Sequence, residues 1–271
     1  MCFAPPEMNL DLYCTFIREL AVASGDVILP YFGRKDVGLE LKADETPVTR
    51  ADRGAEEVMR RMIEHRFPGH GIVGEELGTQ RADAEFVWVL DPIDGTKSFI
   101  SAIPLFGTLI GLLHEGRPVL GCIHQPVLRQ LMLGDGKTTT LNGSPVRVRP
   151  CSELRQATLL TTDPTYPAKF QSAAGYAALE QQVRLSRSWG DCYGYLLVAA
   201  GWADVMVDPI MNPWDLLPVE PIIRGAGGVI TTWQGQPANH LGATSAVASA
   251  PEIHADVIRI LQGRGVGDPN Q

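Results

Sequence analysis

Basic residues are scarce in this chain. Its 271 residues include 23 Lys and Arg against 31 Asp and Glu, which gives a formal net charge of −8. The basic residues are scattered, and the nearest approach to a cluster is Arg147 with Arg149. Nucleic-acid binding depends on a basic stripe that neutralises phosphates. The composition therefore argues against a nucleic-acid partner.

Long hydrophobic runs are also missing. The longest uncharged, mainly apolar run covers residues 193–203, whereas a membrane-spanning helix needs about 18 or more such residues. Residues 1–13 contain Glu7 and Asp11 and have no basic start before an apolar core. They do not resemble a secretory signal. We expect neither a membrane partner nor secretion.

Cysteine and histidine motifs are absent. The five cysteines are odd in number, and no two of them form a CxxC pair. The six histidines show neither HxH nor HExxH spacing, so a histidine-based zinc site has no support. Free thiols in a reducing cytoplasm are the simplest interpretation of this cysteine usage.

The remaining composition is that of a globular protein rich in turns. Hydrophobic residues make up 45% of the chain, which excludes a disordered protein. Gly 28 and Pro 20 together exceed the average share of about 12%. Many turns favour a fold that contains sheets over a helix bundle. The length allows one large domain or two smaller ones.

The first 150 residues combine two helices with a series of strands. Apolar residues at near-helical spacing predict one helix ending near Gly33 and a second from Thr49 to Phe67, with Asp52 at the capping-box position. Short apolar runs between turn signals then predict strands. We expect an antiparallel sheet covered by the two helices. The predicted strands are 86–93, 105–113, 117–124 and 128–133.

After about residue 150 the pattern alternates between strand and helix, which is typical of an α/β layer. Pro221 lies inside one predicted helix and is expected to distort it. The predicted strands are 157–162, 183–186, 204–208, 228–233 and 245–249, and the predicted helices are 168–182, 192–201, 216–225 and 251–261.

The most informative residues are acids at the ends of predicted elements. Asp91 and Asp94 directly follow an apolar strand, and Asp215 precedes a helix. Loop positions on a rigid scaffold are where functional sites are usually built. The remaining acids of this kind are Asp52, Glu75 and Glu76.

A hard divalent cation suits the segment after the strand. Asp91 and Asp94 can direct two carboxylates into one space, and the Ile93 carbonyl is a further candidate ligand. Such oxygen ligands suit Mg²⁺ or Mn²⁺. Gly95 and Thr96 then present backbone amides of the kind that bind phosphate. Acids that hold metals beside amides that hold an anion suit metal-assisted phosphate hydrolysis.

Each acid also has a simpler structural interpretation. Asp94-Gly95 is a common turn, Asp215 suits the N-cap of the next helix, and Asp52 suits a first helical turn. Glu75-Glu76 suits a solvated surface pair. Asp91 is harder to explain in this way, because it ends an apolar run and a buried carboxylate needs a partner.

Three blocks of residues stand out along the chain. They are Gly74-Glu75-Glu76, Trp88-Val-Leu-Asp91-Pro-Ile-Asp94-Gly-Thr96-Lys-Ser-Phe99, and Trp214-Asp215 with Gly225-Ala-Gly227-Gly228. Together they resemble the inositol monophosphatase superfamily. The resemblance runs from the first helix to the last, and it implies a five-layer αβαβα sandwich with α+β and α/β halves. Residues 1–150 would form the half with most metal ligands, and residues 151–271 the half that supplies Asp215 and substrate contacts, with the site between them. A homodimer is usual in the family.

The resemblance also implies a set of metal ligands and a mechanism. Two or three Mg²⁺ ions would bind, with Mn²⁺ as an alternative. Thr96 and Glu75 would orient and deprotonate the attacking water, with no phosphoenzyme, and Asp52 would orient Thr96 or a further water. The amides of Gly95 and Thr96 would hold the phosphate. The implied metal ligands are Glu75, Asp91, the Ile93 carbonyl, Asp94 and Asp215, and Asp94 is also counted among the catalytic residues.

Within the superfamily, the segments 104–110, 121–126 and 189–195 resemble the branch that dephosphorylates histidinol phosphate. That substrate has a cationic leaving group, for which the acids Asp191 and Asp208 and the ring of Tyr193 are candidates. Asp191 is equally suited to the N-cap of the next helix. The further candidate site residues are Asp44, Glu76, Lys97, Gly190 and Cys192.

Three functions compete. The leading one is a Mg²⁺-dependent phosphatase that releases histidinol and phosphate from histidinol phosphate in histidine biosynthesis. The second is a related phosphatase acting on inositol monophosphates or a nucleotide 3′-phosphate. The third is an inactive relative that binds metal and phosphate in a regulatory role. The first two act on a small phosphomonoester, and the third is weakened because every acid that the chemistry needs is present.

Overall fold

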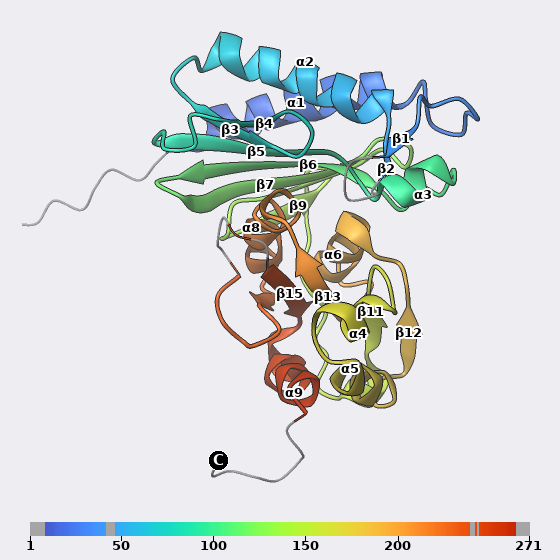
Figure 1. The fold of residues 1–271 in the computed structure, drawn as a ribbon. Helices are drawn as coiled ribbons and strands as arrows, with labels where there is room; N and C mark the ends of the chain where they lie inside the picture. Colours follow the sequence, from blue (N-terminus) through green and yellow to red (C-terminus); the bar gives the residue numbers. More distant parts are fainter. Residues whose placement is uncertain (1–8, 42–46, 239–241, 243, 264–271) are drawn as a thin grey trace, which may run out of the picture.

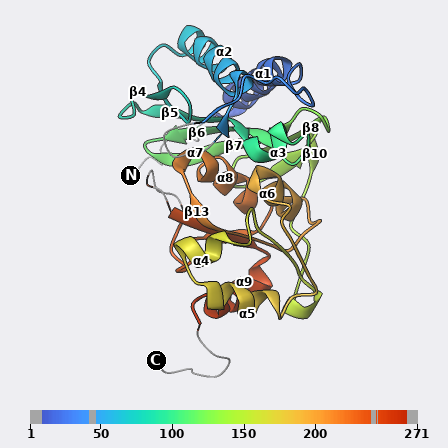
Figure 2. The same ribbon diagram turned by 45° about the vertical axis from the view of Figure 1, so that its right-hand side comes forward.

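Helices and sheets alternate in layers through the molecule (Figure 1). The computed structural model describes residues 9–41, 47–238, 242 and 244–263. The outer helices α1 (Asp11–Ile28) and α2 (Arg50–Arg66) cover a large sheet, and Figure 2 shows the same stacking from a second side. The next layers are α6 (Asp191–Ala199) with α8 (Val219–Gly225), a smaller sheet, and α5 (Ala173–Glu180) with α9 (Pro251–Leu261). The predicted αβαβα sandwich is confirmed.

The large sheet has eight strands in the order β10-β9-β8-β7-β6-β5-β3-β4. The prediction of a wholly antiparallel sheet is wrong at one place, because β3 pairs with β5 in parallel. The short strand β4 turns back against β3 at the sheet edge, so β5 enters alongside β3 in the same direction. The bounds are β3 Gly71–Gly74, β4 Gly78–Gln80, β5 Phe86–Asp94, β6 Gly107–His114, β7 Arg117–Gln125, β8 Gln130–Gly134, β9 Thr139–Leu141 and β10 Ser144–Pro145.

The two outer helices are held on this sheet by apolar side chains. The predicted capping box at the start of α2 is confirmed, since the Thr49 amide donates to Asp52 Oδ2 at 2.8 Å. Helix α1 ends at Ile28, earlier than predicted, and turns follow it. Each fully buried Leu, Ile or Met side chain contributes about 1.5–3 kcal/mol. The shared cluster includes Phe16, Ile17, Leu20, Met59, Ile63 and Trp88.

The smaller sheet has five strands in the order β12-β11-β13-β15-β14, with β11 parallel to both of its neighbours. All five predicted strands are confirmed. The helix predicted over 168–182 is divided into α4 (Tyr166–Phe170) and α5, because the Ser172 hydroxyl caps a new helix at the Gly175 amide. The bounds are β11 Thr158–Leu160, β12 Leu185–Arg187, β13 Val205–Met211, β14 Val229–Thr231 and β15 Thr244–Ser249.

A row of glycines lets the middle helices approach the large sheet closely. Gly111, Gly121 and Gly134 lie side by side on β6, β7 and β8. A Cβ on Gly121 would lie 1.8 Å from the Pro218 carbonyl oxygen, so no side chain fits there. We call these three residues the glycine row. It sets how near α8 and the preceding α7 (Pro213–Leu216) lie to the strands.

The helix predicted over 216–225 is interrupted, but not at Pro221. Helix α7 ends at Leu216, and α8 begins at Val219 after the N-cap Pro218. Pro221 is the third residue of α8, where a backbone amide has no partner within the helix. It therefore costs α8 no hydrogen bond, and the expected distortion at Pro221 is wrong.

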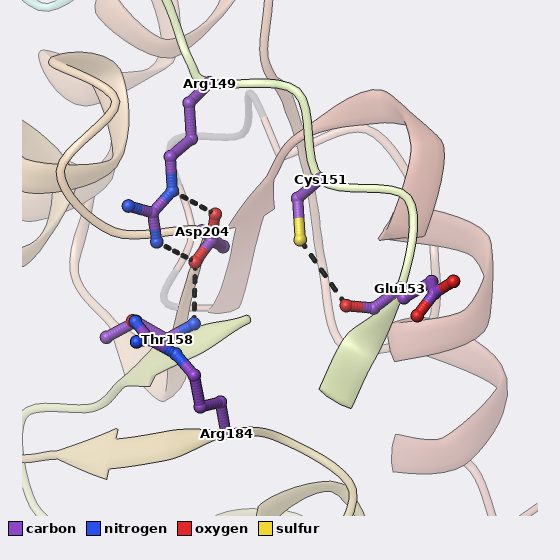
Figure 3. Close-up of polar contacts among 6 residues, drawn as sticks. All are labelled: Arg149, Cys151, Glu153, Thr158, Arg184 and Asp204. Atoms are coloured by element: carbon purple, nitrogen blue, oxygen red, sulfur yellow. Dashed lines mark hydrogen bonds and ion pairs between the residues drawn. The ribbon is translucent and has the colours of Figure 1, made fainter. Parts of the chain in front are cut away.

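An ion pair between a partly exposed arginine and a buried aspartate connects the chain leaving the large sheet to the smaller sheet (Figure 3). Arg149 donates two hydrogen bonds to Asp204, one of them from Nε to Oδ1 at 2.6 Å. Asp204 is 1% exposed, and its Oδ2 also accepts from the Thr158 amide at 2.6 Å. We call Arg149, Asp204 and Thr158 the Asp204 clamp. Its carboxylate has a partner for each oxygen.

The remaining elements are short. They are β1 (Glu40–Leu41), β2 (Pro47–Val48), α3 (Thr96–Ile100) and a 3₁₀ turn (Leu154–Gln156). Among the described residues, no helix combines the length and the apolar character needed to cross a membrane.

Candidate active site

A bulge in β5 brings two acids to one face of the large sheet. Asp91 lies opposite Leu109 and Asp94 opposite Gly107, so β5 has one residue more than β6 in this stretch. In a regular strand, residues three apart point to opposite faces. The extra residue reverses that alternation. Pro92 lies inside the bulge, where its missing amide leaves no ladder bond unmade.

The third acid of this cluster comes from the C-terminal half of the chain. Asp215 is the third residue of α7, and its Oδ2 accepts from the amide of the N-cap Asn212 at 2.8 Å. The interpretation of Asp215 as an N-cap is therefore wrong. Ligand oxygens of Asp91, Asp94 and Asp215 lie within 4.8 Å of one another. We call these three residues the acidic cluster.

The acidic cluster fits a divalent cation. Asp91 is 2% exposed, and its Oδ1 has no hydrogen-bond partner. Within the part of the chain that the structure describes, no Lys or Arg forms an ion pair with any of the three acids. Burying unpaired carboxylates is costly unless a metal or a counter-charge compensates them. Carboxylate oxygens suit Mg²⁺.

Burial and mutual repulsion raise the pKa of every member. Burial raises the pKa of Asp91 well above its usual range, and the nearby charges of Glu75 and Asp94 raise it further. Burial also dominates for Asp94, followed by the charge of Asp191. For Asp215, burial raises the pKa to about 7. A bound cation would reverse this, because an opposite charge favours the ionised form.

Two acids flank the cluster on the side of α2. The Glu75 amide donates to the Leu90 carbonyl at 3.1 Å, which places Glu75 beside the end of β5. Asp52 is fully buried, and its Oδ1 has no partner. Burial raises the pKa of Asp52 to about 6, against the opposing hydrogen bonds from Thr49, and the charge of Glu75 contributes.

The turn after the bulge begins a short helix. Gly95 has φ 95°, a left-handed conformation that favours glycine, and it caps α3. The Thr96 hydroxyl donates to the Ile93 carbonyl at 3.1 Å. Residues 95 and 96 therefore place two amides and one hydroxyl beside Asp94.

An acid from the C-terminal half of the chain lies against this turn. Asp191 is the first residue of α6, after the N-cap Gly190, so its interpretation as an N-cap is wrong. Its Oδ2 lies 3.0 Å from where a Cβ of Gly95 would be. The Cys192 amide donates to Asp94 Oδ2 and so joins α6 to the acidic cluster.

Asp191 and Asp208 repel each other. Burial raises the pKa of Asp191 to about 7, with a contribution from Asp208 and an opposing one from Lys97. Burial raises the pKa of Asp208 to about 6, although Thr162 and Tyr195 donate hydrogen bonds to it. This pair gives the site a second negative region.

A model of the Inositol monophosphatase family matches residues 9–265. The chain belongs to this family. Among curated relatives, the chain is 42% identical to the bifunctional phosphatase IMPL2, chloroplastic, of Arabidopsis thaliana over 93% of this chain and 74% of that protein. It is also 42% identical to a histidinol-phosphatase of Chlorobaculum parvum over 85% of this chain and 87% of that protein.

The solved structures give the same family fold. An inositol monophosphatase from Zymomonas mobilis superposes with a TM-score of 0.84 at 35% identity, covering 94% of this chain and 100% of that one. As an inositol monophosphatase family member, this chain is a phosphatase, and a small phosphate ester is its class of substrate.

Tyr193 and Lys97 have hydrogen-bond partners outside the acidic cluster, whereas the Cys192 side chain is buried beside Asp94. Tyr193 is 8% exposed within a hydrophobic core cluster, and its hydroxyl donates to Gln130 Oε1 at 3.0 Å. Lys97 donates to the Tyr166 hydroxyl at 2.8 Å. Cys192 is buried, and burial raises its pKa well above the usual range, which argues against a reactive thiol. Asp44 lies outside the described residues.

Sequence reasoning missed one buried acid near the site. Glu56 is fully buried on α2, and its carboxylate accepts from the Glu76 amide at 2.8 Å. The spacing of Asp52, Glu56 and Arg60 at four-residue intervals places all three on one helix face. That spacing is a signal that could have identified Glu56.

Proposed function

We propose that this family member is a Mg²⁺-dependent phosphatase that hydrolyses histidinol phosphate to histidinol and phosphate. The observation that carries the proposal is the position of Asp191, whose carboxylate lies against the Gly95 turn. A cationic leaving group attached to a phosphate at that turn would meet this acid directly. The 42% identity to a histidinol-phosphatase supports the same substrate.

The proposed metal ligands are Asp91, Asp94 and Asp215, with Glu75 and the Ile93 carbonyl beside them. Bound Mg²⁺ would supply positive charge that neutralises phosphate and lowers the pKa of water. The unpartnered Oδ1 of Asp91 supports this assignment.

The chain's own groups then hold the substrate and move the proton. The amides of Gly95 and Thr96 bind the phosphate oxygens. Thr96 and Glu75 orient the attacking water, and Glu75 takes its proton. Asp52 supports them from α2, held by the Thr49 hydroxyl and amide. Because the reaction uses water as nucleophile, no residue becomes phosphorylated.

Asp191 and Asp208 select the leaving group. Histidinol carries an amine and an imidazole, which are protonated near or below neutral pH. A positive charge beside Asp191 and Asp208 would relieve their mutual repulsion and hold both ionised. A neutral sugar alcohol gains no such benefit. We expect discrimination of about 100-fold, or roughly 2.7 kcal/mol.

An inositol monophosphate is the second candidate substrate. The observation in its favour is the structural match to the Zymomonas mobilis inositol monophosphatase at 35% identity. Ionised Asp191 and Asp208 could also accept hydrogen bonds from ring hydroxyls. The two candidates share the metal ligands and differ in what the second acid pair binds.

Phosphate release by the purified protein, with and without Mg²⁺, tests the proposal. The panel comprises histidinol phosphate, inositol monophosphates, fructose bisphosphate and a 3′-phosphoadenosine nucleotide. A kcat/KM for histidinol phosphate at least about 100-fold above the others is expected. Preference for an inositol phosphate would retain the metal ligands and replace the substrate. Absence of turnover with Mg²⁺ bound would favour a regulatory relative.

A further inference from the structure

A buried carboxylate on α2 holds the turn that carries Glu75. Glu56 Oε2 accepts from the Glu76 amide at 2.8 Å, and Oε1 accepts from the Leu77 amide at 3.1 Å. Arg60 Nε donates to Oε1 at 2.8 Å. The charge is therefore paired, and both amides that follow Glu75 are held by one side chain.

Further contacts hold the turn of residues 75–77 in place. The Glu75 amide is bonded to the Leu90 carbonyl of β5, and Arg60 donates to the Gly78 carbonyl. A Cβ on Gly74 would lie 2.0 Å from Glu56 Oε1, so the carboxylate lies directly against the backbone before Glu75. No side chain fits between Glu56 and this turn.

The same helix face also carries Asp52. Asp52 precedes Glu56 by one helical turn, and the charge of Glu75 acts on Asp52. Side chains four residues apart on a helix lie above one another. Helix α2 therefore contacts the turn through Glu56, and it carries Asp52 on the same face.

We propose that Glu56 is a positioning residue that fixes the turn of residues 75–77 so that Glu75 presents its carboxylate to Asp91. The inference rests on the proposed metal site, which Glu75 would complete. Glu56 itself touches neither metal nor substrate. Its action passes through two backbone amides, and such charge-assisted bonds are stronger than neutral ones.

The test compares Glu56→Gln with the matched control Glu57→Gln. Glu57 is the next residue on α2, and its side chain is 55% exposed. The side-chain amide in Glu56→Gln can accept through one oxygen only, so one of the two held backbone amides loses its partner. Mg²⁺ alone, titrated calorimetrically, is expected to bind about 10-fold more weakly to Glu56→Gln and normally to Glu57→Gln.

Steady-state kinetics distinguish a positioning role of Glu56 from a general loss of structure. At saturating Mg²⁺, the KM of Glu56→Gln for substrate is expected to stay within about twofold of wild type, while the Mg²⁺ concentration for half-maximal activity rises about 10-fold. Equal Mg²⁺ affinity in wild type and Glu56→Gln would overturn the proposal.

A second variant alters the contact between Glu56 and the turn by changing Gly74 instead of Glu56. Gly74→Ala keeps every charge but pushes a Cβ into the Glu56 carboxylate, and it is expected to weaken Mg²⁺ binding in the same direction.

Amide hydrogen exchange of Glu76 and Leu77 in the metal-free protein gives a readout without metal. Unchanged protection of these amides in Glu56→Gln would also overturn the proposal. If wild-type protein failed to bind Mg²⁺, the proposed function would be refuted. Faster exchange of the two amides in Glu56→Gln would still show that Glu56 holds the turn.

Discussion

Two buried aspartates in this molecule differ in the partners that their carboxylates have. Asp204, at 1% exposure, receives both arms of Arg149 and the Thr158 amide. Asp91, at 2% exposure, has an oxygen without a partner and acids as neighbours. The same residue type at the same depth therefore serves two purposes. The satisfied carboxylate of Asp204 joins parts of the fold, whereas Asp91, with an unpartnered oxygen and acidic neighbours, is suited to hold a cation.

Substituting Asn for Asp91 and for Asp204 should give the largest difference, because the first change should affect activity and the second stability. Asp91→Asn is expected to lower kcat/KM at least about 1,000-fold, or roughly 4 kcal/mol, while the metal-free protein becomes no less stable. Initial rates and urea unfolding of metal-free protein measure both effects. Full activity in Asp91→Asn would rule out the proposed mechanism.

Asp204→Asn should give the reverse pattern. It leaves the Arg149 guanidinium without its charged partner, but the Arg149 side chain is 39% exposed and stays partly solvated, so we expect a cost of about 1–3 kcal/mol. We expect a lower unfolding midpoint in urea but a kcat per folded molecule within about threefold of wild type. A large loss of kcat in well-folded Asp204→Asn would mean that the clamp also shapes the site.

Metal removal should affect only the acidic cluster. Chelation is expected to abolish turnover, and adding Mg²⁺ back at about 100 times its Kd should stabilise wild type by about 2.7 kcal/mol. Asp91→Asn should show little of this stabilisation, whereas Asp204→Asn should show all of it. Thermal unfolding with and without Mg²⁺ measures the difference, and equal shifts in both variants would contradict the comparison.

The pH dependence of stability should differ between metal-free wild type and Asp215→Asn. The folded pKa of Asp215, about 7, lies above the ordinary aspartate value of 3.8. A raised folded pKa gives stability that is present at low pH and is lost as the pH rises through the folded value. Asp215→Asn should therefore exceed wild type in free energy of unfolding by on the order of 4 kcal/mol at pH 8, with the gap closing towards pH 4. A gap that widens at low pH would contradict this sign.

The smallest expected effect concerns substrate choice. Asp191→Asn should raise KM for histidinol phosphate about 10-fold, because the proposed charge pair with the leaving group would be lost. Inositol monophosphate, whose leaving group is neutral, should change less than about threefold. Steady-state kinetics on both substrates decides this, and equal changes would remove Asp191 from specificity.

Much of the fold followed from periodicity, and its failures have physical causes. The strand β3 is only four residues long, Gly-Ile-Val-Gly, and shows no alternation, so it and its parallel pairing with β5 were not predicted. The interruption before α8 depends on how Pro218 lies against the sheet, and local propensity does not contain that contact.

The site was predictable where residues are consecutive and not where they meet across the fold. The segment from Asp91 to Thr96 signalled its chemistry locally. The convergence of Asp94 with Asp191 depends on α6 docking against β5, which joins residues far apart in the chain. Glu56 carried a helical spacing signal, but its contact with the turn after Gly74 could not be seen without the fold.

The glycine row has a consequence for the order of assembly. Asp91 and Asp94 belong to the large sheet, but Asp215 arrives on α7, shortly before the residue that rests against Gly121. During synthesis the first two acids emerge well ahead of the third. A cation held by all three acids would therefore bind fully only after the later half of the chain has packed against the glycine row. A single methyl group at position 121 would block that final step without altering any acid.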